Sequence, residues 1–174
     1  IKAMEYMREE VRKAGFPDMH YMMMDGGGFP YNEGNKARVD NRMFLKPDSW
    51  ALYNMGGFDP DYMRHGQNAI DYRNGWDKYM DIPVFPTVSI GWDDTPRFPA
   101  KGENDVTRFN HSPEAFKNFL KEAKRYADEH PEQPKFVMIN AWNEWVEGSY
   151  LLPDRYWGYG WMEAVNEVFG PVKE

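Results

Sequence analysis

The sequence contains no cysteine, and this absence removes several chemistries at once. Disulfide bonds, thiolate metal sites and cysteine nucleophiles are all excluded. The chain also lacks any apolar run close to the ~18–20 residues that a bilayer-spanning helix needs, so no membrane-spanning segment is predicted. Acidic residues outnumber basic residues, and the net charge is −7. A protein with this charge is not expected to bind nucleic acid, which selects basic surfaces.

The sequence is rich in aromatic residues, which make up 17% of it and include 7 Trp and 11 Tyr. Many of them lie beside glycine, aspartate or asparagine in loop-like sequence. Aromatic rings flanked by carboxylates and amides match the C–H faces and hydroxyls of sugars, whereas core packing is the alternative reason for them. Hydrophobic residues make up 41% of the 174 residues. One domain, residues 1–174, is therefore expected.

Apolar spacing predicts helices that alternate with short apolar strands. Ser112 and Pro113 are typical of a helix start, since serine caps the first turn and proline fits its first position. The predicted helices span residues 2–14, 61–80, 112–129 and 159–169. The predicted strands span residues 20–24, 50–55, 83–90 and 136–140. Alternation of this kind is typical of parallel strands.

Each predicted strand ends in glycine together with acids, amides or tryptophan. The residues at or just after these strand ends are Asp25, Asn54, Trp92 with Asp93 and Asp94, and Asn143 with Glu144. Because parallel strands share one carboxyl edge, the four loops are expected to form one acidic, aromatic pocket, as in (β/α)8 TIM-barrel enzymes. A doubly wound sheet is disfavoured, because no helix is predicted directly behind Gly26–Gly28.

The length predicts only part of such a barrel. A complete barrel needs about 250 residues, and four strands are found here. The chain is therefore expected to hold the C-terminal four strand–helix units of a (β/α)8 barrel catalytic domain. Its expected protein partner is the missing N-terminal half of the same barrel.

Glu144 and Glu147 are the candidate catalytic pair. If the chain turns helically between them, their Cβ atoms lie about 5–6 Å apart on one face. Two carboxylates so placed separate into a proton-bearing and an ionised form, and the neighbouring tryptophans strengthen that separation. Glycosidases obtain an acid and a base in this way. An exposed pair on a surface helix, without function, is the alternative.

The remaining candidates are assigned to substrate binding. Trp92 is expected to stack on a sugar, and Asn143 to bind a hydroxyl or orient a glutamate. Asp93 and Asp94 are expected to accept sugar hydroxyls or to cap the turn before Pro96. Arg97 is expected to form an ion pair with one of these aspartates rather than to touch substrate. The set is completed by Asp25, Trp142, Trp145 and Tyr150.

No metal or other cofactor is expected. The four histidines, His20, His65, His111 and His130, are scattered over different predicted elements and form no i,i+4 pair. The methionines, including Met22–Met24, are interpreted as adaptable core filling.

Two segments carry a family resemblance: INAWNEWVEGSYLLPD at residues 139–154 and SIGWDDTPR at residues 89–97. Both resemble signatures of the glycoside hydrolase family 99-like enzymes, a group that includes the WbsX-type proteins of polysaccharide loci. The resemblance implies a (β/α)8 barrel that cleaves α-mannosides within a glycan and retains configuration. It also implies that Glu144 is the base assisting attack by the sugar's own 2-hydroxyl and that Glu147 is the general acid/base. The pathway implied is an anhydro sugar without a covalent enzyme intermediate.

The match is closer to the WbsX-like branch than to the endo-mannosidases. Hydrolysis of a glycan is the first hypothesis, with a carbohydrate as the substrate. Glycosyl transfer in surface-polysaccharide synthesis and non-catalytic carbohydrate binding stay open as alternatives. An enzyme of this kind is expected to be exported to the periplasm or surface of a bacterium.

Overall fold

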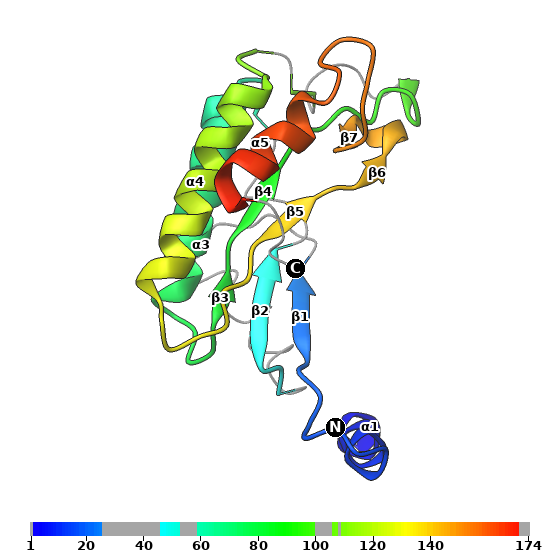
Figure 1. The fold of residues 1–174 in the computed structure, drawn as a ribbon, viewed down its shortest axis with the longest axis vertical. Coiled ribbons are helices and arrows are strands. Elements are labelled where there is room, and N and C mark those ends of the chain that lie inside the picture. The colour runs from blue at the N-terminus through cyan, green and yellow to red at the C-terminus, as the bar shows by residue number, and fades with distance from the viewer. Residues whose placement is uncertain (1, 26–45, 53–58, 100–105, 108, 171–174) are drawn as a thin grey trace.

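The computed structural model describes residues 2–25, 46–52, 59–99, 106–107 and 109–170. Its helices are α1 (Lys2–Lys13), α3 (Tyr62–Asp77), α4 (Pro113–Glu129), α5 (Gly160–Phe169) and the short 3-10 helix η2 (Trp145–Glu147). Its strands are β1 (Met22–Asp25), β2 (Ser49–Leu52), β3 (Val84–Phe85), β4 (Thr87–Ser89), β5 (Met138–Asn140), β6 (Asn143–Glu144) and β7 (Ser149–Tyr150). The chain is a mixed α/β fold (Figure 1).

The first five strands are parallel and follow one another in chain order. β1 pairs with β2, β2 with β3, and β4 with β5. The predicted single strand at 83–90 is divided at Pro86, which has no N–H to donate to a ladder. Its carbonyl still accepts a bond from Met138 N at 2.9 Å. No strand of the described chain lies on the second edge of β1 or of β5.

All four predicted long helices are confirmed within a few residues. Asp61 caps α3 by accepting a bond from Met63 N, and Ser112 caps α4 by accepting one from Ala115 N. Side-chain caps satisfy N–H groups that the first turn of a helix leaves unpaired. Pro113 lies at the start of α4, as predicted from the Ser112-Pro113 pair.

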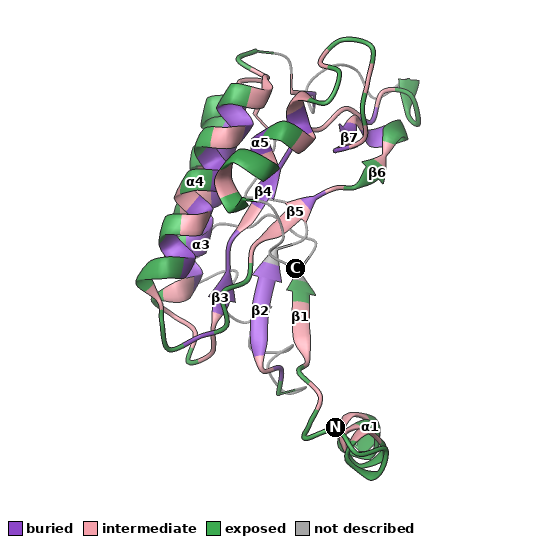
Figure 2. Cartoon of the chain, viewed as in Figure 1, coloured by how far each residue is buried: buried purple, intermediate pink, exposed green. Residues whose placement is uncertain are grey.

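Helices α3 and α4 lie side by side and cover the β3–β4 strands, and α5 packs on α4 (Figure 1). The larger core cluster joins these elements through Val88, Phe116, Leu120 and Trp161. Trp50, a residue of β2, is fully buried and belongs to a second core cluster. Figure 2 shows that purple, buried positions concentrate where the helices face the strands.

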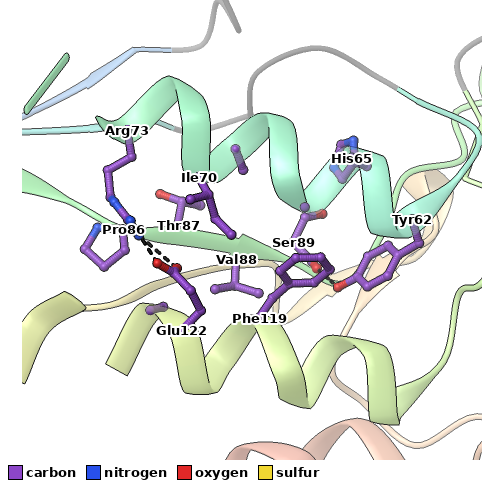
Figure 3. A pocket seen from close by; sticks show the side chains of 13 residues that line it. Tyr62, His65, Ile70, Arg73, Pro86, Thr87, Val88, Ser89, Phe119 and Glu122 are labelled. Atoms are coloured by element: carbon purple, nitrogen blue, oxygen red, sulfur yellow. Dashed lines mark hydrogen bonds and ion pairs between the residues drawn. The ribbon is translucent and has the colours of Figure 1, made fainter. Parts of the chain in front are cut away.

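The close approach of α3 to α4 depends on Gly66. A Cβ at this position would meet the Phe119 ring at 2.1–2.4 Å, so only glycine fits without movement. At the far end of the same contact, Arg73 donates two hydrogen bonds to Glu122, at 3.0 and 2.9 Å (Figure 3). This pair, in which Arg73 is buried and Glu122 half-buried, fixes the second point at which the two helices meet.

Helix α1 stands apart from this core (Figure 1) and buries none of its residues. Arg8 connects it to the strands through an ion pair with Asp48 and a 2.6 Å bond to the Met19 carbonyl. In the described part of the chain, no helix is long and apolar enough to cross a bilayer.

Candidate active site

The segment that follows β5 folds as a small β-hairpin. Strands β6 and β7 pair antiparallel, with Asn143 opposite Tyr150 and Glu144 opposite Ser149. The single turn of η2 connects them, and Gly148 closes it at φ +60°, a left-handed conformation that glycine adopts without strain. The predicted helical turn between the glutamates is therefore a 3-10 turn, and the hairpin around it was not predicted.

This hairpin packs against the loop that follows β4. Ile90 N donates to the Asn140 carbonyl at 2.9 Å, and Asp93 N donates to the Glu147 carbonyl at 2.7 Å. A Cβ on Gly148 would lie only 3.0 Å from Asp93 Cβ. Because β4 and β5 are parallel, both loops leave from the same edge. The two matching signature segments are thereby brought into contact.

Glu147 is the last residue of η2, within the hairpin, and it is buried, with 7% of its surface exposed. Arg97 Nη1 donates to its Oε1 at 2.5 Å, and the pair joins positions fifty apart in sequence. Its Oε2 is buried and has no hydrogen-bond partner among the described residues. A buried carboxylate needs a counter-charge, and Arg97 provides it.

The predicted pairing of Arg97 with Asp93 or Asp94 is thus wrong. Asp93 instead accepts bonds from Thr95 N at 3.0 Å and Thr95 Oγ1 at 2.6 Å, the turn-capping role that had been the alternative to sugar binding. Asp94 contacts Arg97 through the backbone, where its carbonyl accepts from Arg97 N at 3.0 Å. The turn so formed carries the guanidinium away from both aspartates and towards Glu147.

Glu144 immediately precedes the 3-10 turn and is half-buried. A 3-10 helix has about three residues per turn, so Glu144 and Glu147 stand one turn apart. The two differ in environment, because Glu147 is buried against Arg97 while Glu144 keeps part of its surface exposed.

The aromatic candidate residues differ in how far they are exposed and in what they contact. Trp142 and Trp145 are exposed, at 55% and 48%. The Trp145 ring stacks on Tyr150, with centroids 4.0 Å apart. Trp92 is half-buried, and its backbone pairs with Thr107 through two bonds of 2.8 and 3.1 Å. Asn143 is exposed beside them.

Two of the four predicted loops fall outside the described residues. Asp25 ends β1 and pairs with Leu52 in the parallel register, but its side chain is not described. The glycines at 26–28 and the loop at Asn54 also lie outside the described residues. The convergence of loops is therefore established for those after β4 and β5 alone.

A buried polar network fixes the base of the hairpin. The fully buried Ser149 hydroxyl donates to the Gly91 carbonyl and accepts a bond from Asn140 Nδ2 at 3.2 Å. Ser89 Oγ donates to the same carbonyl at 3.0 Å. These bonds join β4, β5 and β7 at the edge where the candidate residues lie.

Sequence reasoning missed His111 and Asp154. His111 stands before α4, binds the Ile90 carbonyl and stacks on Trp161 at 4.9 Å. Burial lowers its pKa, against smaller raising effects of the Ile90 carbonyl and Asp154. Asp154 accepts bonds from Tyr156 N and Trp157 N at 2.7 and 2.5 Å. A single histidine without periodic spacing carried no signal for the long-range contacts of His111, whereas the bonds of Asp154 are local to its own turn.

No group of three or more metal-ligating side chains occurs in the part of the chain that the structure describes. The candidate residues present carboxylates, a guanidinium and aromatic rings. Such a set can bind hydroxyls, stack on sugar rings and exchange protons.

Comparisons with known proteins give one family and one fold. A family model described as "Glycosyltransferase WbsX" matches residues 1–165. Two curated relatives, both described as "Uncharacterized protein WxcX", come from Xanthomonas campestris pv. campestris, strains B100 and ATCC 33913. Each is 35% identical over 89 residues, which is 51% of this chain and 12% of the relative. The matched segment is thus a small part of those longer proteins.

A solved structure described as "Glycoside hydrolase-like protein" shares the fold. It is similar over 97% of this chain and 49% of its own length, with a TM-score of 0.65 and 16% sequence identity. The chain therefore spans about half of that structure.

Proposed function

The chain belongs to the glycosyltransferase WbsX family, and from that premise and the site geometry we propose that it is a hydrolase of α-linked glycans. The proposed substrate class is an α-mannoside or a related α-linked sugar within a polysaccharide. The observation that carries the proposal is the buried Glu147 carboxylate of the aromatic hairpin, held by Arg97.

The proposed architecture is half of a (β/α)8 barrel. Five short parallel strands in chain order, without reversal, support it, as does the shared fold with half of a glycoside hydrolase-like structure. The unpaired edges of β1 and β5 in the described chain are where further strands would complete the sheet. In this proposal the N-terminal half supplies the rest of the barrel and of the pocket wall.

Glu147 is the proposed general acid/base. Because Arg97 occupies its Oε1, and Oε2 is enclosed without a hydrogen-bond partner among the described residues, proton exchange with the leaving glycosidic oxygen would require a local rearrangement that opens Oε2 to the substrate. Low exposure strengthens the effect of every nearby charge on this carboxylate. Arg97 would set the orientation in which Oε2 meets the substrate.

Glu144 is the proposed base. Its greater exposure and its position one 3-10 turn away support a role different from that of Glu147, since two carboxylates in different environments divide the acid and base tasks. As Glu144 takes the proton of the sugar 2-hydroxyl, O2 would bond to C1 while the glycosidic C1–O bond breaks and Glu147 protonates the leaving oxygen, which gives the 1,2-anhydro sugar that the family 99 resemblance implies. A water molecule deprotonated by Glu147 would then open that ring at C1, with the proton on Glu144 returned to O2. Trp142 and Trp145 are the proposed stacking surfaces.

The proposal is tested by measuring the turnover of α-linked mannose oligosaccharides by the variants Glu144→Gln and Glu147→Gln. Each variant should lose turnover by at least about a hundredfold, the size of general acid–base effects, while keeping glycan affinity. Glu167→Gln is the matched control, because this exposed carboxylate lies on α5 outside the candidate site and pairs with Lys117 at 2.9 Å. Survival of turnover in both glutamate variants would refute the proposal. Glycan binding without turnover in the wild type would favour the non-catalytic alternative.

Glycosyl transfer is the second candidate, and the name of the family favours it. A transferase that uses a nucleotide sugar binds its diphosphate through basic groups or a divalent cation. The one Asp-x-Asp sequence, Asp59-Pro60-Asp61, uses its carboxylates to cap α3 and to accept bonds from Asp61 N and Asn110 Nδ2. Product formation that depends on a nucleotide sugar would select transfer over hydrolysis.

A further inference from the structure

A cavity of about 350 Å³ opens beside the hairpin, and Glu147 is not among its lining residues. Gly148 and Tyr150 form its hairpin side, and the loop at Asp154–Trp157 forms the opposite side. His111 and Trp161 line it as well. Its size lies at the small end of ligand pockets, which range over about 300–1,000 Å³, and suits one sugar ring with bound water.

Successive aromatic rings line the cavity on the side of the 154–157 loop and α5. Tyr156 contacts Trp157 at 4.7 Å between centroids, Trp157 contacts Trp161 at 6.0 Å, and Trp161 contacts His111 at 4.9 Å. Tyr150 lines the cavity and also stacks on Trp145. The surface on which a sugar can stack therefore extends beyond the glutamate pair.

Polar groups in the cavity suit hydroxyls. Burial, the charge of Asp154 and a hydrogen bond to the Asp154 carboxylate raise the pKa of the Tyr150 phenol. The phenol proton is engaged by Asp154, so the phenol oxygen is what can accept a hydrogen bond from a sugar hydroxyl. His111 binds the Ile90 carbonyl through Nε2, which assigns the proton to that atom and leaves Nδ1 as an acceptor. None of the described lining residues is lysine or arginine, so a phosphate or nucleotide would find no cation among them.

Tyr156 extends this row of rings into solvent, with 82% of its surface exposed. The turn beneath it is well ordered, because Asp154 and Gly158 exchange backbone bonds of 3.1 and 3.0 Å and the Asp154 carboxylate accepts from Tyr156 N. Apart from its edge contact with Trp157, this ring is open to solvent. It offers a stacking surface at a small cost in conformational entropy.

We propose that this cavity is a second sugar subsite, which binds a neighbouring ring of the same α-linked glycan and stacks it on Tyr156 and Trp157. The assignment rests on the proposed function for the identity of the glycan. The subsite selects long substrates over short ones.

The test measures binding of α-linked mannose oligosaccharides of two to six units to the full chain, by NMR of the tryptophan indoles. The indole signals of Trp157 and Trp161 should shift with the longer oligosaccharides. Tyr156→Ala should weaken binding of these roughly five- to tenfold, which is typical of one lost stacking contact, and should spare the disaccharide. Tyr156→Phe should keep wild-type affinity. Tyr159→Ala, also exposed but outside the cavity lining, is the matched control.

The outcomes separate this proposal from the hydrolase. Unmoved indole signals with every oligosaccharide, or equal weakening of short and long ligands by Tyr156→Ala, would overturn the subsite. Turnover with a KM for long substrates that Tyr156→Ala leaves unchanged would remove the subsite and keep the hydrolase. Length-dependent binding without turnover would keep the subsite and remove the hydrolase.

Discussion

Arg97 and Glu147 form an ion pair of 2.5 Å across two loops that follow different strands. Glu147 is almost fully buried, whereas 44% of the Arg97 side chain is exposed. The arginine therefore reaches inward from a surface turn to neutralise a carboxylate that the hairpin encloses. This contact joins the two signature segments chemically as well as spatially.

Arg97→Gln should lower the free energy of unfolding by about 1–3 kcal/mol, because it removes a charged hydrogen bond and leaves a buried carboxylate without its counter-charge. Glu147→Gln in the same background should recover part of that loss. A double-mutant cycle from denaturant unfolding measures the coupling between the two side chains. Arg64→Gln is the matched control, since Arg64 is exposed and pairs with Asp59 at 3.4 Å. Purely additive losses would contradict the ion pair's role.

Ser149→Ala should loosen the hairpin. The variant removes the hydroxyl that joins the Gly91 carbonyl to Asn140, and an unsatisfied buried polar group costs about 1–3 kcal/mol. Hydrogen exchange should accelerate at the amides of Gly148 and Leu151, which donate to the Trp145 and Ala141 carbonyls. Ser112→Ala, which removes the cap of α4, should instead accelerate exchange in the first turn of that helix. Equal effects of both variants on the hairpin would argue against the network.

His111→Gln should flatten the dependence of stability on pH. Because burial depresses the pKa of His111 below its ordinary 6.5, the unfolded chain takes up its proton first as the pH falls. Wild-type stability should therefore be fully present above about pH 6.5 and decline towards the folded-state pKa. Asp154, which faces His111, opposes this effect but does not reverse it. Urea unfolding from about pH 7 to about pH 5 measures the difference, and parallel curves for the two proteins would contradict it.

Gly66→Ala should destabilise the protein by about 1–3 kcal/mol, the usual cost of overpacking. The sign is informative, because helix propensity alone would make the same change stabilising by about 1 kcal/mol. Phe119→Leu should restore part of the loss, since the added Cβ meets the Phe119 ring. Gln67→Ala, at the exposed neighbouring position, should change the melting temperature little. A stabilised Gly66→Ala variant would refute the close contact.

The sequence by itself determined the alternation of the long helices with parallel strands and the presence of a helical turn between the two glutamates. Apolar periodicity, Ser112 with Pro113, and the stops at glycine are local signals, so α3, α4 and α5 were predicted within a few residues. The two signature segments were recognised from contiguous residues for the same reason. Local chemistry also predicted the alternative in which Asp93 caps its own turn.

Only the tertiary structure decided which side chains meet. Arg97 forms its ion pair with Glu147, fifty positions away in the sequence, and not with the neighbouring aspartates. The reason is that the turn at Asp94 directs the guanidinium across to the hairpin. His111 acquired its role from Ile90 and Trp161, which other elements bring to it. Such pairings depend on how strands and loops pack, and packing depends on contacts between distant residues that no local pattern records.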